Sequence, residues 1–272
     1  NAFDNDISKW NVSAVIGSCN CENIIDSTSL QTDILNNNNI DYVPSDMLNN
    51  CAQISGLSNG SNICFNRPQE VLNNSTISNA LQNFNNISYI NKYNHIKVWN
   101  IAQVTILTSS VMNNYPNYET NFNEDIGNWN TENISTMQGM FAGTKVFNKD
   151  ISKWNVSGVL DMSYMFNNAV KFNNGNAYLN WNDTSKVFTM KSMFQNASDF
   201  NQDIGNWNVN KVSDMQDMFN GATSFNNGGS VLSWYETSQV LTMKSMFQNA
   251  SDFNQDISSW PVNKVSDMQD MF

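Results

Sequence analysis

The sequence is poor in the residues on which nucleic-acid binding, membrane docking and membrane insertion depend. Charged residues make up only 14% of the chain, and the formal net charge is −11. Because a nucleic-acid-binding surface needs a basic face, this balance argues against nucleic-acid partners and against docking on anionic membranes. No apolar run approaches the length that a helix needs to cross a bilayer, so we expect no membrane insertion within this segment.

Catalytic and cofactor-binding motifs are missing as well. His95 is the only histidine, so no Ser-His-Asp or Cys-His constellation can be argued, and no Gly-rich phosphate loop is present. The spacing of Cys19, Cys21, Cys51 and Cys64 matches no usual zinc site. Two disulfides are one interpretation of these cysteines, and a small buried residue is another for Cys51. We therefore expect a protein that is not an enzyme and that holds no metal or cofactor.

What the chain has is an excess of asparagine, roughly a fifth of all residues, and an internal repeat. The excess suits turns and side-chain ladders, although AT-rich coding DNA would also produce it. Units that begin at a Trp follow one another in steps of 25, 27, 26, 27 and 26 residues, at Trp129, Trp154, Trp181, Trp207, Trp234 and Trp260. A fixed period of this length is typical of a stacked repeat protein.

Two stretches of the repeat are almost identical. Thr189–Phe219 returns as Thr242–Phe272, and the copies differ only at Gly205/Ser258, Asn206/Ser259 and Asn208/Pro261. Within a unit, the apolar residues of 212–222 follow the spacing of one helix face, and Ser213 with Gln216 forms a capping-box pattern. Alternation in Trp207-Asn-Val209 predicts a short strand. We therefore predict an α/β repeat solenoid, leucine-rich-repeat-like, with short parallel strands on one face and short helices on the other.

The regularity of the repeat differs between the two parts of the chain. Residues 120–272 carry regular repeats of 25–28 residues, whereas residues 1–119 are interpreted as degenerate repeats with Cys-containing irregular segments of the same solenoid. Residues 17–39 and 77–98 fit no unit, so they are degenerate repeats or insertions that loop out of the stack. The chain opens inside a repeat, which indicates a fragment of a longer protein.

The repeat resembles a known family. The pattern Phe-Asn-Gln-Asp-Ile-x-x-Trp-x-Val-x-x-Val-x-Asp-Met-x-x-Met-Phe is similar to the roughly 25-residue repeat of Mycoplasma-type surface lipoproteins, which are grouped with the BspA-like leucine-rich repeat surface proteins. Met47–Leu57 looks like the other BspA-like form, Ala-Phe-x-x-Cys-x-x-Leu-x-x-Ile. The resemblance implies an extracellular location at the cell surface and a role in adhesion or in protein binding, and it brings no catalytic residues.

The longer units depart from this pattern. Phe172–Trp181 and Phe225–Trp234 both lack the Asp of Asn-x-Asp-Ile, which argues against a side-chain ladder through every repeat. Where that Asp is present, at Asp125, Asp150, Asp203 and Asp256, calcium binding is one interpretation. Hydrogen bonding in turns is the favoured one, because the spacing of known calcium loops is absent.

The Trp column allows two interpretations, a sugar-stacking platform or an internal aromatic stack, and the need of each repeat to bury apolar residues favours the second. The residues on either side of each Trp are then expected to face outward. They form a nearly uncharged row and are the predicted binding residues: Asn128, Asn130, Lys153, Asn155, Asn180, Asn182, Asn206, Asn208 and Tyr235.

Two functions fit the repeat. The first is a non-enzymatic cell-surface protein that mediates adhesion or binds a protein or glycan on another cell or host surface. The alternative is a structural spacer or fibre segment with no ligand of its own, because near-identical repeats suit a part selected for length.

Overall fold

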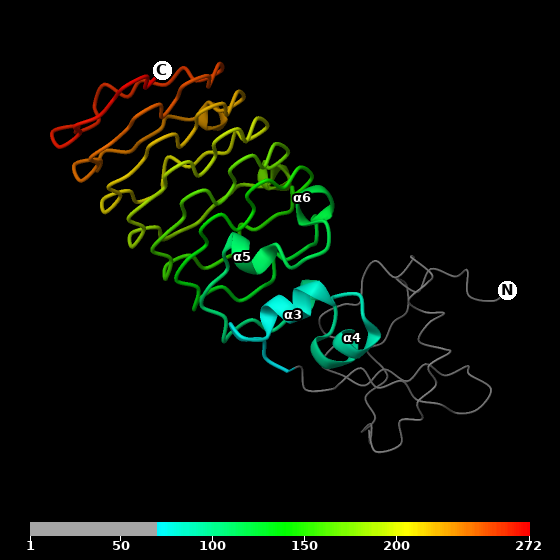
Figure 1. The fold of residues 1–272 in the computed structure, drawn as a ribbon. Coiled ribbons are helices and arrows are strands. Elements are labelled where there is room, and N and C mark those ends of the chain that lie inside the picture. The colour runs from blue at the N-terminus through cyan, green and yellow to red at the C-terminus, as the bar shows by residue number, and fades with distance from the viewer. Residues whose placement is uncertain (1–69) are drawn as a thin grey trace, which may run out of the picture. The chain divides into compact units, whose positions relative to one another are not determined.

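The computed structural model describes residues 70–272, which belong to a compact unit that begins at Gln69. In this unit the chain winds through successive turns that lie one on the next, from green to red in Figure 1. We call each turn a rung and name it by the Trp with which it begins. The predictions for the four cysteines and for the repeats within residues 1–69 lie outside the described residues.

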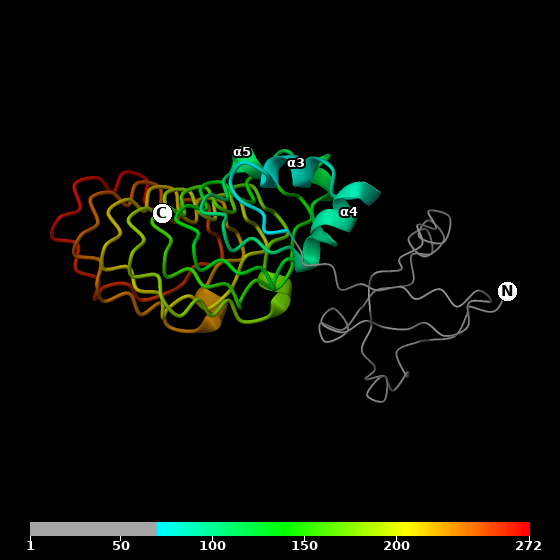
Figure 2. The same cartoon turned by 90° about the horizontal axis from the view of Figure 1, so that it is seen from below.

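Helices are few in this unit, and most of them precede the regular rungs. Figures 1 and 2 place α3 and α4 at the end of the stack where its first rungs lie. The elements are α3 (Ile77–Gln82), α4 (Ile87–Tyr93), η4 (Ile96–Val98), α5 (Ser109–Met112), α6 (Tyr118–Asn121), η5 (Asn174–Asn176) and η6 (Asn227–Gly229). Residues 77–98, which fit no unit in the sequence, form α3, α4 and η4, and Ile77, Leu81 and Ile96 of this segment are buried in the core of the stack.

The predicted α/β solenoid with parallel strands and opposing helices is wrong. Within residues 70–272 there is no extended strand, and neighbouring rungs are joined by isolated parallel bridges of one residue each. Around one of them, Leu160 N donates to Ser135 O at 2.9 Å and Met137 N donates to Asp161 O at 3.0 Å. The regular bridges are Ile106↔Thr136, Thr136↔Asp161, Asp161↔Thr189, Thr189↔Asp214, Asp214↔Thr242 and Thr242↔Asp267.

After each bridge residue the chain forms a turn. The helix predicted over 212–222 is therefore wrong, because these residues contain such a turn. Met218 N donates to Met215 O at 3.2 Å, as in a β-turn, and Asp217 lies between them at a φ of 55°. This left-handed conformation interrupts an α-helix, and Asp tolerates it better than most residues. The corresponding residue of every regular rung is also at positive φ, namely Gly139, Tyr164, Ser192, Asp217, Ser245 and Asp270.

The turned backbone directs its N–H groups to the next rung instead of along a helix. Asp217 N donates to Lys244 O and Phe219 N donates to Met246 O, both at 2.9 Å. The predicted capping box does not form either, because Ser213 Oγ donates to Phe188 O of the preceding rung at 3.2 Å. Pairing between rungs thus replaces pairing within a helix, which satisfies the same backbone groups.

The apolar residues of each rung form one continuous core. In one unit the helical spacing predicted that four of them are buried. All four are fully buried although no helix forms: Met215, Met218, Phe219 and Ala222. Equivalent rings stack from rung to rung, with centroids 5.3 Å apart for Phe166–Phe194, 5.7 Å for Phe194–Phe219 and 5.5 Å for Phe219–Phe247. Such offset aromatic contacts add to the free energy gained from burial alone.

An asparagine ladder runs along the stack at the residue after the Phe that closes each rung. The side-chain oxygen of each Asn accepts the backbone N–H of the Asn in the next rung, at distances between 2.8 and 3.0 Å. The members are Asn123, Asn148, Asn173, Asn201, Asn226 and Asn254. A side-chain ladder therefore does run through every regular rung, contrary to what the missing Asp indicated, because the longer rungs lose the Asp but keep this Asn.

Candidate functional site

The nine predicted binding residues all lie exposed on the surface, while the Trp between them are buried. The Trp side chains from Trp129 to Trp260 are between 1% and 6% exposed. The turn chemistry of the rung therefore carries alternate side chains outward, as predicted, without forming a strand. We call the nine residues the flanking row: Asn128, Asn130, Lys153, Asn155, Asn180, Asn182, Asn206, Asn208 and Tyr235.

Local turns hold the Asn residues that follow Trp. The Oδ1 of Asn155 accepts the N–H of Ser157, and the Oδ1 of Asn208 accepts the N–H of Asn210, both at 3.0 Å. These are Asx turns, in which a side chain caps the backbone two residues further on. Within the described residues, the amide nitrogens of Asn155 and Asn208 make no hydrogen bond, so each offers free donors to the solvent.

Contacts between rungs bring the residues that precede Trp together in pairs. Asn206 Nδ2 donates to Asn180 Oδ1 at 3.0 Å, and Lys153 Nζ donates to Asn128 Oδ1 at 3.4 Å. No hydrogen bond in residues 70–272 joins one pair to the other. The flanking row thus contains two separate hydrogen-bonded pairs rather than a single chain of bonds.

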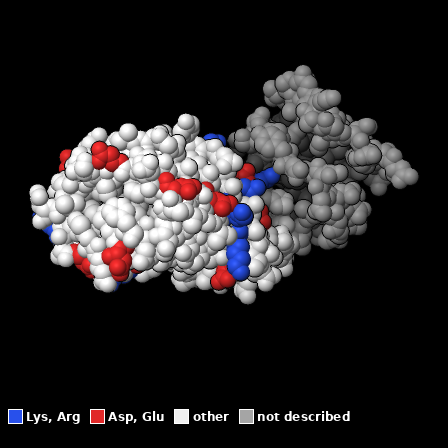
Figure 3. Space-filling model, turned by 90° about the horizontal axis from the view of Figure 1, so that it is seen from above, with Lys and Arg blue, Asp and Glu red and all other residues white. Residues whose placement is uncertain are grey.

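The row carries almost no charge. Lys153 is its only ionisable cation, and Asp183 beside Asn182 is exposed. Hydrogen bonds from the hydroxyl and backbone N–H of Ser185 lower the pKa of Asp183, so its carboxylate stays ionised at neutral pH. Charged side chains are also sparse on the face of the stack that Figure 3 shows. A partner of this surface meets hydrogen-bonding groups more than fixed charges.

The longer rungs add exposed apolar side chains that were missed in the sequence. Tyr178 is 79% exposed and Val231 is 65% exposed, and they occupy the same place in their rungs, three residues before Trp. Tyr235, the aromatic member of the flanking row, is 61% exposed. The available signal was the extra length of Phe172–Trp181 and Phe225–Trp234, because inserted residues of a tightly packed rung must move outward.

The structure also places the Trp and Asp residues on which the other chemical interpretations of the repeat rest. Because the Trp rings are buried, they cannot serve as a sugar-stacking platform, and two pairs of them, Trp181 with Trp207 and Trp234 with Trp260, stack inside the core. The recurring Asp oxygens accept N–H groups of their own turns, as Asp150 does from Ser152 at 2.9 Å and Asp256 from Ser258 at 2.9 Å. In residues 70–272, no three His, Cys, Asp or Glu side chains are grouped so that they could hold a metal ion.

These features define a stacked repeat protein with a polar, nearly uncharged outer row. The model of a family described as "Mycoplasma protein of unknown function, DUF285" matches residues 75–183 and again residues 176–272, so the chain belongs to this family. The match confirms the Mycoplasma-type repeat, whereas the BspA-like leucine-rich repeat assignment stays a prediction. No curated protein and no solved structure matches the chain. None of the helices in residues 70–272 has the length and apolar character that crossing a bilayer requires.

Proposed function

We propose that this protein is a non-enzymatic binding module of the cell surface, which holds a protein or glycan partner through the flanking row. The proposal combines the surface location implied by the family resemblance with the composition of the row. It draws on no catalytic group, and its specificity comes from side chains that vary on a repeated backbone.

One observation carries the proposal. Nine side chains on successive rungs are exposed at equivalent places, and they are mostly amides whose donors are partly free. Such groups recognise a partner through directional hydrogen bonds, and the exposed Tyr178 and Tyr235 add the amphipathic rings that are enriched at binding surfaces. Because few charges are displaced, binding should depend only weakly on salt concentration.

The test replaces Asn155, Asn182 and Asn208 together by Asp. At positions 155 and 208 Asp keeps the oxygen that caps the turn, as Asp150 and Asp256 do elsewhere, while at position 182 the neighbouring Asp183 already caps it. At all three positions Asp replaces amide donors by negative charge. We expect the variant to fold normally and to lose binding in a glycan-array and host-protein pull-down screen in which the parent protein binds.

The matched control places the same three charges outside the row. Gln103, Gln138 and Gln269 are exposed, and their replacement by Glu should leave binding unchanged. If the folded Asn-to-Asp variant binds as well as the parent, the row is not the binding surface. If the parent protein is monodisperse and binds nothing in either screen, the binding function itself is wrong.

The alternative, a spacer with no ligand, is favoured by a different observation. The core stacks and the asparagine ladder continue from rung to rung with nearly constant geometry, which suits a segment that keeps two ends apart. A spacer should tolerate insertion or deletion of the 53-residue block that repeats at Thr189 and Thr242 without loss of activity in the whole protein. A binding row should lose affinity when its members are removed by the same deletion.

A further inference from the structure

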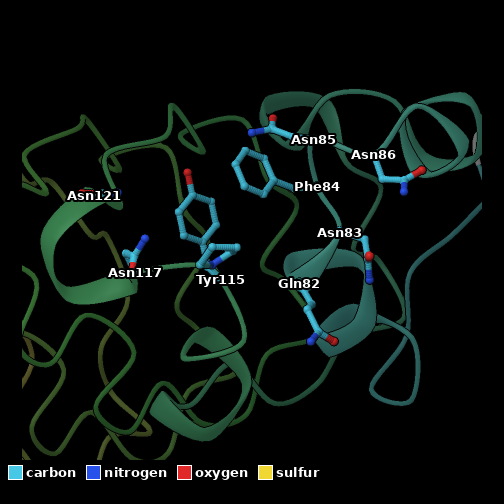
Figure 4. A pocket seen from close by; sticks show the side chains of 9 residues that line it. Gln82, Asn83, Phe84, Asn85, Asn86, Tyr115, Asn117 and Asn121 are labelled. Carbon is cyan, nitrogen blue, oxygen red and sulfur yellow. The ribbon is translucent and has the colours of Figure 1, made fainter.

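A second surface feature lies away from the flanking row, between the helical segment and the first part of the stack. It is a hollow of about 410 Å³, within the range of small-molecule sites, which is roughly 300–1,000 Å³. One wall is the connection between α3 and α4, and the other wall runs from Tyr115 into α6, as Figure 4 shows. The lining residues are Gln82, Asn83, Phe84, Asn85, Asn86, Tyr115, Pro116, Asn117 and Asn121.

The floor of the hollow is an aromatic pair. The rings of Phe84 and Tyr115 stack with centroids 4.4 Å apart and planes inclined by 24°, and Tyr115 meets Phe122 edge-on at 5.0 Å. Tyr115 is only 6% exposed and donates its hydroxyl to Glu124 Oε1 at 2.8 Å. Burial and this hydrogen bond raise the pKa of Tyr115, so the phenol stays neutral. The buried Tyr115 therefore fixes the half-buried Phe84, whose ring is partly accessible from the hollow.

The walls carry amides whose hydrogen-bonding capacity is largely unused. Within the described residues, the side chains of Gln82, Asn85, Asn117 and Asn121 make no hydrogen bond, and all four are exposed. Asn83 donates to Asn79, and Asn86 accepts from Ser88 N, so these two amides are partly engaged. An amide offers two donors and an acceptor, and no charged side chain lines the hollow.

We propose that this hollow binds a neutral saccharide. A sugar ring presents hydroxyls that both donate and accept, which matches free amides, and a C–H face that packs on an aromatic ring, which matches Phe84. The lack of positive charge in the lining disfavours anionic ligands such as sialic acid or phosphate, whose strongest hydrogen bonds are made with cationic side chains. The site is distinct from the flanking row and does not depend on it.

The test is saturation-transfer NMR on the whole chain with D-galactose, D-glucose and N-acetyl-D-glucosamine as neutral probes and N-acetylneuraminic acid as the charged probe. We expect at least one neutral sugar to receive saturation at millimolar concentration, and the charged sugar to receive less. Saturation of no neutral sugar, or of the charged sugar as strongly, would overturn the proposal.

Variants locate the site. Asn85→Ala with Asn121→Ala removes two exposed amides that make no hydrogen bond within residues 70–272. The fold should therefore persist, while the Kd for the sugar rises roughly tenfold for two lost hydrogen bonds. Phe84→Ala should abolish saturation, and circular dichroism checks that it is folded. Asn113→Ala, exposed and outside the hollow, is the control and should change nothing.

Two outcomes separate this site from the row. The Asn155, Asn182 and Asn208 triple variant should bind the sugar as the parent does, because those side chains do not line the hollow. Sugar binding that is lost in the triple variant and kept in the Asn85 and Asn121 double variant would place the saccharide on the row and overturn the hollow.

Discussion

At the scale of single residues, the Trp side chains show how a rung of different length disturbs a regular contact. Trp154, Trp181 and Trp234 each donate their indole N–H to the backbone carbonyl of the Ile that stands three residues before the previous Trp, at 3.0 to 3.1 Å. Trp260 reaches Leu232 O, two residues before Trp234, only at 3.4 Å, and within residues 70–272 the buried indole nitrogen of Trp207 has no partner. The extra residues of Phe172–Trp181 and Phe225–Trp234 therefore displace the carbonyls that Trp207 and Trp260 would use.

This difference predicts that Trp→Phe lowers the free energy of unfolding by different amounts at different rungs. Trp207→Phe and Trp234→Phe remove similar buried volume, from side chains that are 3% and 1% exposed. Only Trp234→Phe breaks a hydrogen bond, whereas Trp207→Phe removes a buried donor that is unsatisfied. We expect Trp234→Phe to lower the free energy of unfolding by about 1–3 kcal/mol more than Trp207→Phe does, measured by urea denaturation. Equal losses in the two variants would contradict this assignment.

At the scale of the structural element, the asparagine excess suggested side-chain ladders, but the sequence did not show which Asn of the rung forms one. The Phe-Asn pair recurs at every rung, but a recurring Asn is also ordinary turn composition, so its role was not evident. In the structure, Asn201 Oδ1 accepts both Asn226 N at 2.9 Å and Gly228 N at 2.8 Å. The ladder thus fixes the corner at which each rung passes to the next.

The ladder also supplies its own control. Asn201→Ala leaves two backbone N–H groups without an acceptor, and we expect a loss of about 1–3 kcal/mol in the free energy of unfolding. Asn254 occupies the same place in its rung, but in residues 70–272 its side chain accepts no hydrogen bond, so Asn254→Ala should cost much less. Urea unfolding of both variants makes the comparison, and similar losses would show that the ladder contributes little to stability.

At the scale of the whole molecule, each rung is stabilised by the rung that follows it, because the following rung supplies hydrogen-bond acceptors for its backbone N–H groups. The near-identical copies Thr189–Phe219 and Thr242–Phe272 allow the effect of a following rung to be measured on almost the same sequence. Asp217 N and Phe219 N donate to the following rung, whereas Asp270 N and Phe272 N make no hydrogen bond in the described part of the chain. Burial differs in the same way, since Phe219 is fully buried and Phe272 is 72% exposed.

We therefore expect the amides of Asp270 and Phe272 in this 272-residue chain to exchange hydrogen much faster than those of Asp217 and Phe219. Amide exchange followed by NMR or mass spectrometry reports each copy separately. The control compares the amides of Met218 and Met271. Both N–H groups donate to a carbonyl of their own turn at 3.2 Å, so their exchange rates should differ less. Equal protection of the two copies would show that rungs are stable without a following neighbour.

The sequence by itself determined the period, the set of buried side chains and the uncharged character of the flanking row. Met215, Met218 and Phe219 are buried as their spacing predicted, because apolar side chains leave water whatever the backbone does. Their spacing did not determine the backbone conformation of this segment, because successive turns place side chains in the core as regularly as a helix of two turns does.

Only the tertiary structure decided between these backbones. A helix would pair its N–H groups internally, but a stacked neighbour offers carbonyls to Asp217 N and Phe219 N, and a residue at positive φ directs the chain toward them. The same holds for the hollow, whose two walls, residues 82–86 and 115–121, meet only when the chain has folded. Hydrogen bonds between residues distant in sequence leave no period of their own, so the residue pattern alone cannot reveal them.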